Sequence, residues 1–204
     1  MNNILMVGIT PHPPIIIPEV GGAEVEKVQN TVESLQKLAR EIKTTNPETV
    51  VIITPHGPVF RDAVAVTGEN ELTGSLKQFG APQIRIQVAN DLDLVRYIVE
   101  EAAKEQVLGI KMDKKQAQNY DLSLELDHGA LVPMYFLKKE QVQCSYVHIT
   151  IGFLSYPELY SFGKAIQRAA QRADRKIAVL ASGDLSHCLI PGAPVQYHPA
   201  GAEF

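Results

Sequence analysis

The chain has 204 residues, of which 45% are hydrophobic and 21% charged, and its formal net charge is −4. This length predicts one domain, the charge balance gives no electrostatic footprint for nucleic acid, and no apolar run approaches the roughly 20 residues that span a membrane. Only two cysteines are present and the first residues lack the basic start of a signal peptide, so we expect a protein of the reducing cytoplasm.

A short apolar run opens the chain and stops at a proline-rich turn. Residues 4–9 have the length and composition of a buried strand, and Pro11, His12 and Pro13 follow. Because proline fixes φ and has no N–H to give to a sheet, the strand must end near Thr10. His12 is therefore held in a stiff turn, which suits a metal ligand as well as an ordinary loop residue.

The same arrangement returns one helix later. Apolar residues recur at three- and four-residue steps over residues 25–42, which predicts an amphipathic helix that ends at Asn46. A second buried strand, Thr49–Thr54, then leads directly into a Pro-His-Gly turn that contains His56.

The middle of the chain is less regular. Asp91 has the features of an N-cap for a helix that buries residues 92–102 on one face. Asp127 and His128 follow the last of four short segments with strand-like patterns. Those strands are predicted at residues 63–67, 83–88, 108–112 and 122–126.

The last part of the chain alternates between strands and helices. Residues 130–137 are apolar all round, which predicts a buried helix with Pro133 in or near its first turn. The alternation predicts one three-layer α/β domain over residues 1–204, with a central, mostly parallel or mixed sheet. Its remaining elements are a strand at 145–151, a helix at 157–173 and a strand at 176–180.

Four histidines follow predicted buried strands: His12, His56, His128 and His187. In an open α/β sheet, ligands bind at the carboxyl ends of the strands. Because four such placements exceed what chance explains, we expect these side chains to share one site.

Chemistry suggests a role for each group. His12 and His56 lie in matched rigid turns and are predicted to bind a metal, since neutral imidazoles suit iron, zinc, copper or nickel. His187 lies in a turn without proline, which is less rigid than the turns of His12 and His56, and it is predicted to be a general acid–base. The carboxylates of Asp127 and Asp184 could orient an imidazole by accepting a hydrogen bond from the ring nitrogen that does not bind the metal. Alternatively, they could simply cap helices and turns.

The other candidates carry weaker signals. His148 alternates within a strand and is interpreted as structural, whereas His198 could line the entrance of the site. Cys188 adjoins His187, but sequence neighbours rarely face each other as a catalytic pair, so a cysteine nucleophile is disfavoured. The sequence contains no GxSxG, GxxxxGK[ST] or HExxH motif.

Four short motifs, taken in order, resemble the class III extradiol ring-cleavage dioxygenases, the LigB-like family of the protocatechuate 4,5-dioxygenase catalytic subunit. They are Pro-His-Pro-Pro at 11–14, Pro-His-Gly at 55–57, Asp-His-Gly at 127–129 and Ser-Gly-Asp-Leu-Ser-His at 182–187. Residues 197–204 resemble a sub-branch associated with Memo-like and AMMECR-type proteins.

The resemblance implies Fe(II) held by His12, His56 and a carboxylate, with zinc as the alternative metal. It also implies a catechol-like substrate that is cleaved by O₂ beside its hydroxyl groups. The resemblance further implies that His187 is the acid–base and that His128 is a second proton donor or a substrate contact.

One departure concerns the carboxylate ligand, which the family supplies well after the motif that ends in His187. Here Glu203 is the sole acidic residue of the tail. We therefore expect a chain that lacks the family's C-terminal part. The third metal ligand would then come from water or from a partner chain, either a second copy of this chain or another protein. Two other functions stay open: a Memo-like binding or regulatory module, and a zinc hydrolase with a metal-bound water as nucleophile.

Overall fold

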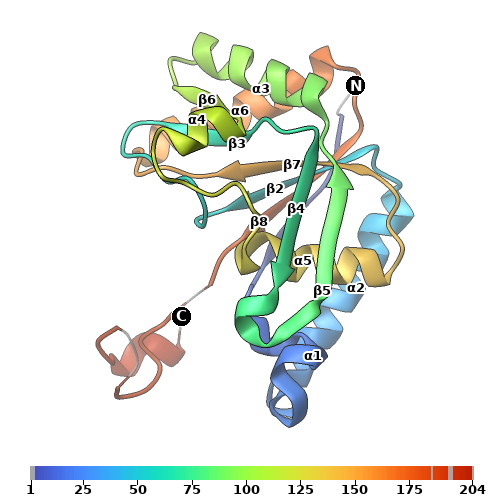
Figure 1. The fold of residues 1–204 in the computed structure, drawn as a ribbon, viewed down its shortest axis with the longest axis vertical. Helices are drawn as coiled ribbons and strands as arrows, with labels where there is room; N and C mark the ends of the chain where they lie inside the picture. Colours follow the sequence, from blue (N-terminus) through green and yellow to red (C-terminus); the bar gives the residue numbers. More distant parts are fainter. Residues whose placement is uncertain (1–2, 185, 193–194, 204) are drawn as a thin grey trace.

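Six strands form one mixed sheet in the order β1-β8-β2-β7-β3-β6 (Figure 1). The computed structural model describes residues 3–184, 186–192 and 195–203. Neighbouring strands run parallel, except that β3 is antiparallel to β7. The six strands are β1 (Ile4–Thr10), β2 (Thr49–Thr54), β3 (Val64–Thr67), β6 (Gly109–Met112), β7 (Ser145–Thr150) and β8 (Ile177–Ser182).

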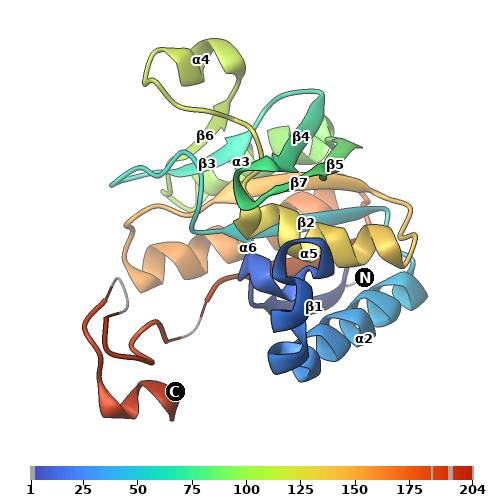
Figure 2. The same cartoon turned by 60° about the horizontal axis from the view of Figure 1, so that its bottom comes forward.

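Helices cover both faces of this sheet. In β2, Val50 and Ile52 join the core formed with α2 and α5, whereas Val51 joins the core formed with α3 and α6. Figures 1 and 2 show these two helix pairs on separate sides of the strands. The predicted three-layer α/β architecture is therefore confirmed. The helices are α1 (Pro18–Gly21), α2 (Gln29–Thr45), α3 (Leu92–Lys104), α4 (Lys114–Gln118), α5 (His128–Lys139) and α6 (Tyr156–Arg172).

A separate antiparallel hairpin lies over the α5 face of the sheet. It consists of β4 (Glu71–Leu76) and β5 (Ala81–Ala89), joined by a 3-10 turn at Lys77–Phe79. Its apolar side chains belong to the same core as α2 and α5. The alternation at 83–88 predicted β5, but β4 was not predicted, because Gly74 and Ser75 interrupt its apolar pattern.

The prediction of a strand at 122–126 is wrong. This segment is a loop that meets β4 through a single bridge, in which the Leu126 amide donates to the Thr73 carbonyl over 2.8 Å. Leu126 alone is buried in the loop, so its alternating pattern reflects one anchored residue and not a strand. His128 consequently begins a helix and does not follow a strand of the sheet.

Helix boundaries agree with the capping signals more closely than with the apolar pattern. Asp91 caps α3, since its Oδ1 accepts from the Leu94 amide over 3.0 Å, and Asn46 ends α2 with a left-handed φ of 51°. However, α2 begins at Gln29, after a 3-10 segment at Gly22–Val28. The short helix α4, which Asp113 caps, was not predicted.

The chain after β8 leaves the body of the molecule. Figures 1 and 2 show residues 186–192 and 195–203 in an arm that ends in a short helical turn, Pro199–Ala202. Throughout the described ranges, no helix combines the length and apolar character needed to cross a membrane.

Candidate metal centre

Three histidines from distant parts of the chain meet at one end of the sheet. His12, His56 and His128 each offer a ring nitrogen, and these atoms lie within 4.8 Å of one another. The ring centroids are 4.8 Å apart for the first pair, 5.3 Å for His12 and His128, and 4.4 Å for His56 and His128. Such a cluster can hold a metal ion.

The sheet topology explains why these rings converge. β1 and β2 both run parallel to β8, which lies between them, so all three strands end at the same edge. His12 and His56 each follow the end of their strand by two residues. Helix α5 begins at this edge and contributes His128 as its first residue.

His12 is almost fully buried, with 1% of its surface exposed. Its Nδ1 lies 3.0 Å from the Ser182 hydroxyl, and its backbone amide donates to Asp184 Oδ1 over 3.2 Å. Burial lowers the pKa of the His12 imidazole, although the nearby Asp184 carboxylate opposes this effect. Burial thus favours the neutral ring, which is the form that binds a metal.

His56 is fixed by its turn and by a carboxylate. Its Nδ1 lies 2.9 Å from Asp127 Oδ2, so in the neutral ring this nitrogen is the donor and Nε2 keeps its lone pair. The turn requires Gly57, whose φ is 120° and where a Cβ would approach Thr150 Oγ1 to 2.6 Å. The Pro-His-Gly pattern thus has a steric cause.

His128 lies between the other two rings and the hairpin. The rings of His128 and Phe79 meet in a T-shaped arrangement at a centroid distance of 5.2 Å. Its Nδ1 is buried and has no hydrogen-bond partner among the described residues, and Asp127 Oδ2 lies 3.8 Å away. Burial lowers the pKa of His128, against the opposing charge of Asp127. A buried nitrogen without a partner is costly unless a ligand engages the ring.

These residues fit a divalent transition metal. Three imidazoles provide borderline-soft nitrogen donors, two of them with lowered pKa values, and two carboxylates stand behind them. Four histidines were predicted to share one site, and the geometry brings three of them together, whereas His187 lies outside this cluster. Which of these rings bind a metal remains a prediction.

The two aspartates each touch more than one functional group. Asp127 is the N-cap of α5, where Oδ1 accepts from the Gly129 amide over 2.9 Å, and it also faces His56. Capping and orienting are thus compatible, because the two oxygens divide these roles. Asp184 Oδ2 lies 3.6 Å from His12 Nε2 and 3.5 Å from His187 Nε2.

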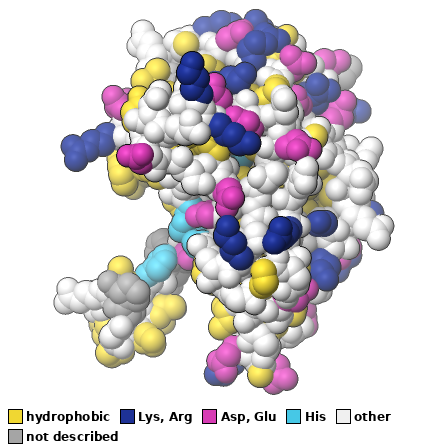
Figure 3. All heavy atoms as spheres, in the orientation of Figure 1, with side chains coloured by type: hydrophobic (Ala, Val, Ile, Leu, Met, Phe, Trp, Pro, Cys, Tyr) yellow, Lys and Arg dark blue, Asp and Glu magenta, His cyan; other side chains and the backbone are white. Residues whose placement is uncertain are grey.

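His187 lies at the mouth of the cluster and not inside it. Its side chain is 60% exposed, and Asp184 connects it to His12. Figure 3 shows histidine and acidic side chains gathered in the hollow where the C-terminal arm leaves the body. An exposed imidazole beside a buried one can exchange protons with solvent, as an acid–base must.

The arm also carries His198 and Glu203. His198 caps the last helical turn, and its Nδ1 accepts from the Ala200 amide over 3.2 Å. Within the described part of the chain, neither residue has a hydrogen bond or ion pair to the three clustered histidines. Their predicted roles at the entrance of the site, and any role of Glu203 as ligand, stay predictions.

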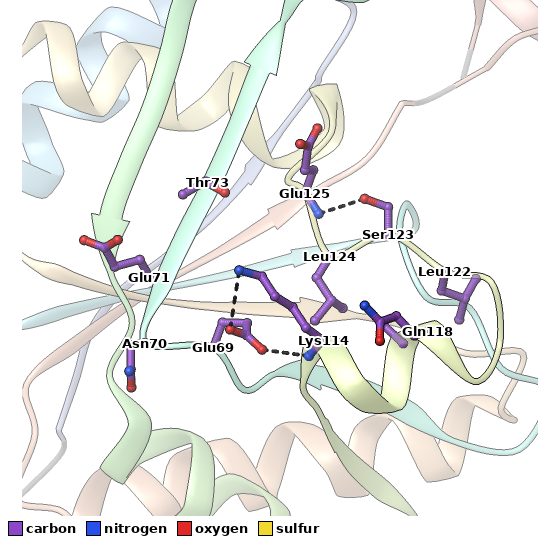
Figure 4. A pocket seen from close by; sticks show the side chains of 11 residues that line it. Glu69, Asn70, Glu71, Thr73, Lys114, Gln118, Leu122, Ser123, Leu124 and Glu125 are labelled. Carbon is purple, nitrogen blue, oxygen red and sulfur yellow. Dashed lines mark hydrogen bonds and ion pairs between the residues drawn. The ribbon is translucent and has the colours of Figure 1, made fainter.

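A polar cavity of about 400 Å³ opens elsewhere, between β4 and α4 (Figure 4). Its lining includes the Glu69–Lys114 ion pair, together with Glu71 and Glu125, but none of the histidines. We do not assign the chemistry to this cavity, because the convergent neutral imidazoles lie outside its walls.

The sequence did not identify two residues of the site. Ser182 supports His12 from the end of β8, and Phe79 forms a wall beside His128. The serine lies in a recognised motif next to a strand end, so its position could have been noticed. Phe79 reaches the site only through the hairpin, and no local signal marks it.

His148 is a buried histidine beside this site. Its Nδ1 lies 3.0 Å from the Thr67 hydroxyl, and only 5% of the residue is exposed. This partner on β3 agrees with the structural interpretation. Burial lowers the pKa of His148 to about 4.

The burial of His148 predicts how the free energy of unfolding changes with pH. Between pH 6.5 and 4 the unfolded chain takes up a proton at this ring and the folded chain does not, so the folded state loses about 3 kcal/mol over that interval. Urea unfolding at pH 7 and pH 4 should show this loss in the wild type and a correspondingly smaller loss in His148→Gln. Equal pH dependence in both proteins would contradict the buried, neutral ring.

Comparison with known proteins shows which protein family this chain belongs to. The model of the family described as the catalytic LigB subunit of aromatic ring-opening dioxygenase matches residues 7–204. The chain therefore belongs to the LigB family, and the resemblance found in the sequence motifs is confirmed.

Two curated relatives are longer than this chain. Protein CA_C1420 of Clostridium acetobutylicum is 39% identical over 196 residues, which cover 96% of this chain and 42% of that protein. The 3,4-dihydroxyphenylacetate 2,3-dioxygenase of Escherichia coli is 25% identical over 193 residues, which cover 91% of this chain and 66% of the enzyme. The chain thus spans less than two thirds of either relative.

Among solved structures, the uncharacterized protein JW3007 of Escherichia coli K12 overlaps with 74% of this chain and 53% of its own. The TM-score is 0.48 and the identity 18%, an overlap too partial to assign a function.

Proposed function

We propose that this chain forms the metal-binding part of an Fe(II)-dependent, extradiol-type dioxygenase that acts on a catechol-like aromatic substrate with O₂. The observation that carries the proposal is the convergence of His12, His56 and His128 at the carboxyl edge of the sheet. Family membership supports the reaction type, and the E. coli relative is a dioxygenase of a dihydroxylated aromatic compound by its name.

His12 and His56 would hold the metal through Nε2, since the Nδ1 atoms of both rings already face Ser182 and Asp127. His128 is the third imidazole within reach. When bound, iron supplies the redox chemistry by which O₂ reacts with an aromatic diol, and zinc, which has no redox chemistry, does not.

The remaining side chains manage protons and water. A catechol must lose protons as it reacts, and His128 can accept one because burial favours its neutral ring and, among the described residues, its Nδ1 has no hydrogen-bond partner. His187 can pass a proton to or from solvent, and Asp184 Oδ2 lies 3.5 Å from its Nε2. Phe79 excludes water from one side of His128.

The direct test is an activity assay. The purified chain would be loaded with Fe(II) without oxygen, and a panel of catechols would then be added with O₂. We expect a yellow ring-opened product from at least one catechol. Stoichiometric iron without any product across the panel would contradict the proposal, and turnover of ester substrates with zinc would favour a hydrolase.

Asp127→Asn should weaken metal binding by roughly 10–100-fold, because the variant loses the negative charge that orients the Nδ1–H of His56. The helix cap should survive, since asparagine caps helices as well as aspartate does. Competition with a metal-sensitive dye measures the affinity. Asp93→Asn, at a side chain that is 73% exposed on α3, is the matched control. Equal affinity in all three proteins would exclude this role for Asp127.

We also infer a cytoplasmic location, because Cys144 and Cys188 are both free thiols. A homo-oligomer or a partner chain that contributes a further ligand remains part of the proposal, tested by measuring mass in solution with and without metal.

A further inference from the structure

A buried hydroxyl connects His12 to the start of helix α5. Ser182, the last residue of β8, is 5% exposed. Its Oγ lies 2.5 Å from the Gly129 carbonyl oxygen and 3.0 Å from His12 Nδ1. One hydroxyl thus touches a candidate metal ligand and the residue that follows His128.

The acceptor for this hydroxyl exists because of a proline. In an α-helix the Gly129 carbonyl would accept from the amide of residue 133, but Pro133 has no N–H. A buried carbonyl needs another donor, and Ser182 supplies it. Gly129 also lets the start of α5 lie close to the end of β2, since a Cβ there would lie 2.3 Å from Thr54 Oγ1.

The positions of the protons follow from this contact. A carbonyl oxygen can only accept, so the single Ser182 proton must point to Gly129. The Ser182 oxygen can then only accept from His12, which places the proton of the neutral ring on Nδ1. The distance from His12 Nε2 to Asp184 Oδ2 is 3.6 Å, longer than a hydrogen bond, as expected for a nitrogen without a proton.

We propose that Ser182 is a positioning residue that fixes His12 as the Nδ1–H tautomer, with the Nε2 lone pair directed into the histidine cluster. The relevance to metal binding rests on the proposed function. A ring held in this form can bind a cation without first changing its tautomer, so Pro133, Gly129 and Ser182 together prepare the site before the metal arrives.

The first test uses the metal-free wild-type chain at pH 8. Long-range ¹H–¹⁵N correlation spectra report which nitrogen of each histidine carries the proton, and a His12→Gln spectrum assigns the signal. We expect Nδ1–H for His12 in the wild type and in Ser182→Thr, and a mixture with Nε2–H in Ser182→Ala. Nε2–H in the wild type would overturn the proposal without any variant.

The second test measures the affinity for Zn²⁺ alone. Ser182→Ala should bind Zn²⁺ about 10–100-fold more weakly than the wild type, whereas Ser182→Thr should restore most of the affinity. Ser34→Ala, at an exposed position on α2, is the control for loss of a hydroxyl. Unchanged tautomer and unchanged affinity in a folded Ser182→Ala would overturn the proposal.

The two tests separate this inference from the proposed function. Nδ1–H without any metal binding to the wild type would refute the metal role and leave the tautomer assignment standing. Metal binding that depends on His12, combined with Nε2–H in the metal-free chain, would refute the assignment alone.

Discussion

Replacing His12 or His56 with alanine is expected to abolish stoichiometric metal binding. Each ring has its Nδ1 engaged and its Nε2 available, so each substitution removes a prearranged donor. Loss of a ligand should reduce the affinity by more than the roughly 100-fold upper range for loss of a supporting residue. The metal content of purified, dialysed protein measures the effect, and ring cleavage should disappear with it.

The control for this prediction is His198→Ala, which removes an imidazole from the exposed arm. Its metal content should equal that of the wild type. Circular dichroism must show that all variants are folded, since His12 is buried. One ion per chain retained by both His12→Ala and His56→Ala would mean that the metal lies elsewhere.

Replacing His187 with asparagine is expected to lower kcat by about 10²–10⁴-fold, the usual contribution of a general acid–base. Metal content and KM should change little, because this side chain is 60% exposed and lies outside the three-histidine cluster. Steady-state kinetics with a catechol that the wild type cleaves gives both parameters.

The pH dependence distinguishes this role from a merely structural one. If His187 transfers the proton, the rate of the variant should lose one limb of the wild-type pH profile, and small imidazole-like bases added to the assay should recover part of it. A variant that loses its metal together with its activity would instead identify His187 as a ligand.

Much of this arrangement could be predicted from local chemistry. Proline and glycine stop β1 and β2 at defined residues, and parallel strands must end at one edge of a sheet, so the meeting of His12 and His56 follows from pattern alone. The capping residue Asp91 and the helix end at Asn46 were also readable, because each acts within a few residues of itself.

Contacts between distant segments could not be predicted in this way. His128 reaches the cluster from the first turn of a helix and not from a strand end, because the preceding loop is anchored by Leu126 on the hairpin. The support that Ser182 gives to His12 depends on a carbonyl left free by Pro133, 49 residues earlier in the chain than the serine and brought near it only by the packing of α5.

The histidines at this edge of the sheet are proposed to form a metal centre. A crystal structure of the Fe(II)-loaded chain, with anomalous diffraction at the iron edge, would show whether an ion lies between them. We expect one ion at about 2.0–2.2 Å from Nε2 of both His12 and His56, the usual range for metal–imidazole bonds. An iron-loaded crystal with no anomalous peak between these two rings, or with the ion bound at another site, would contradict it.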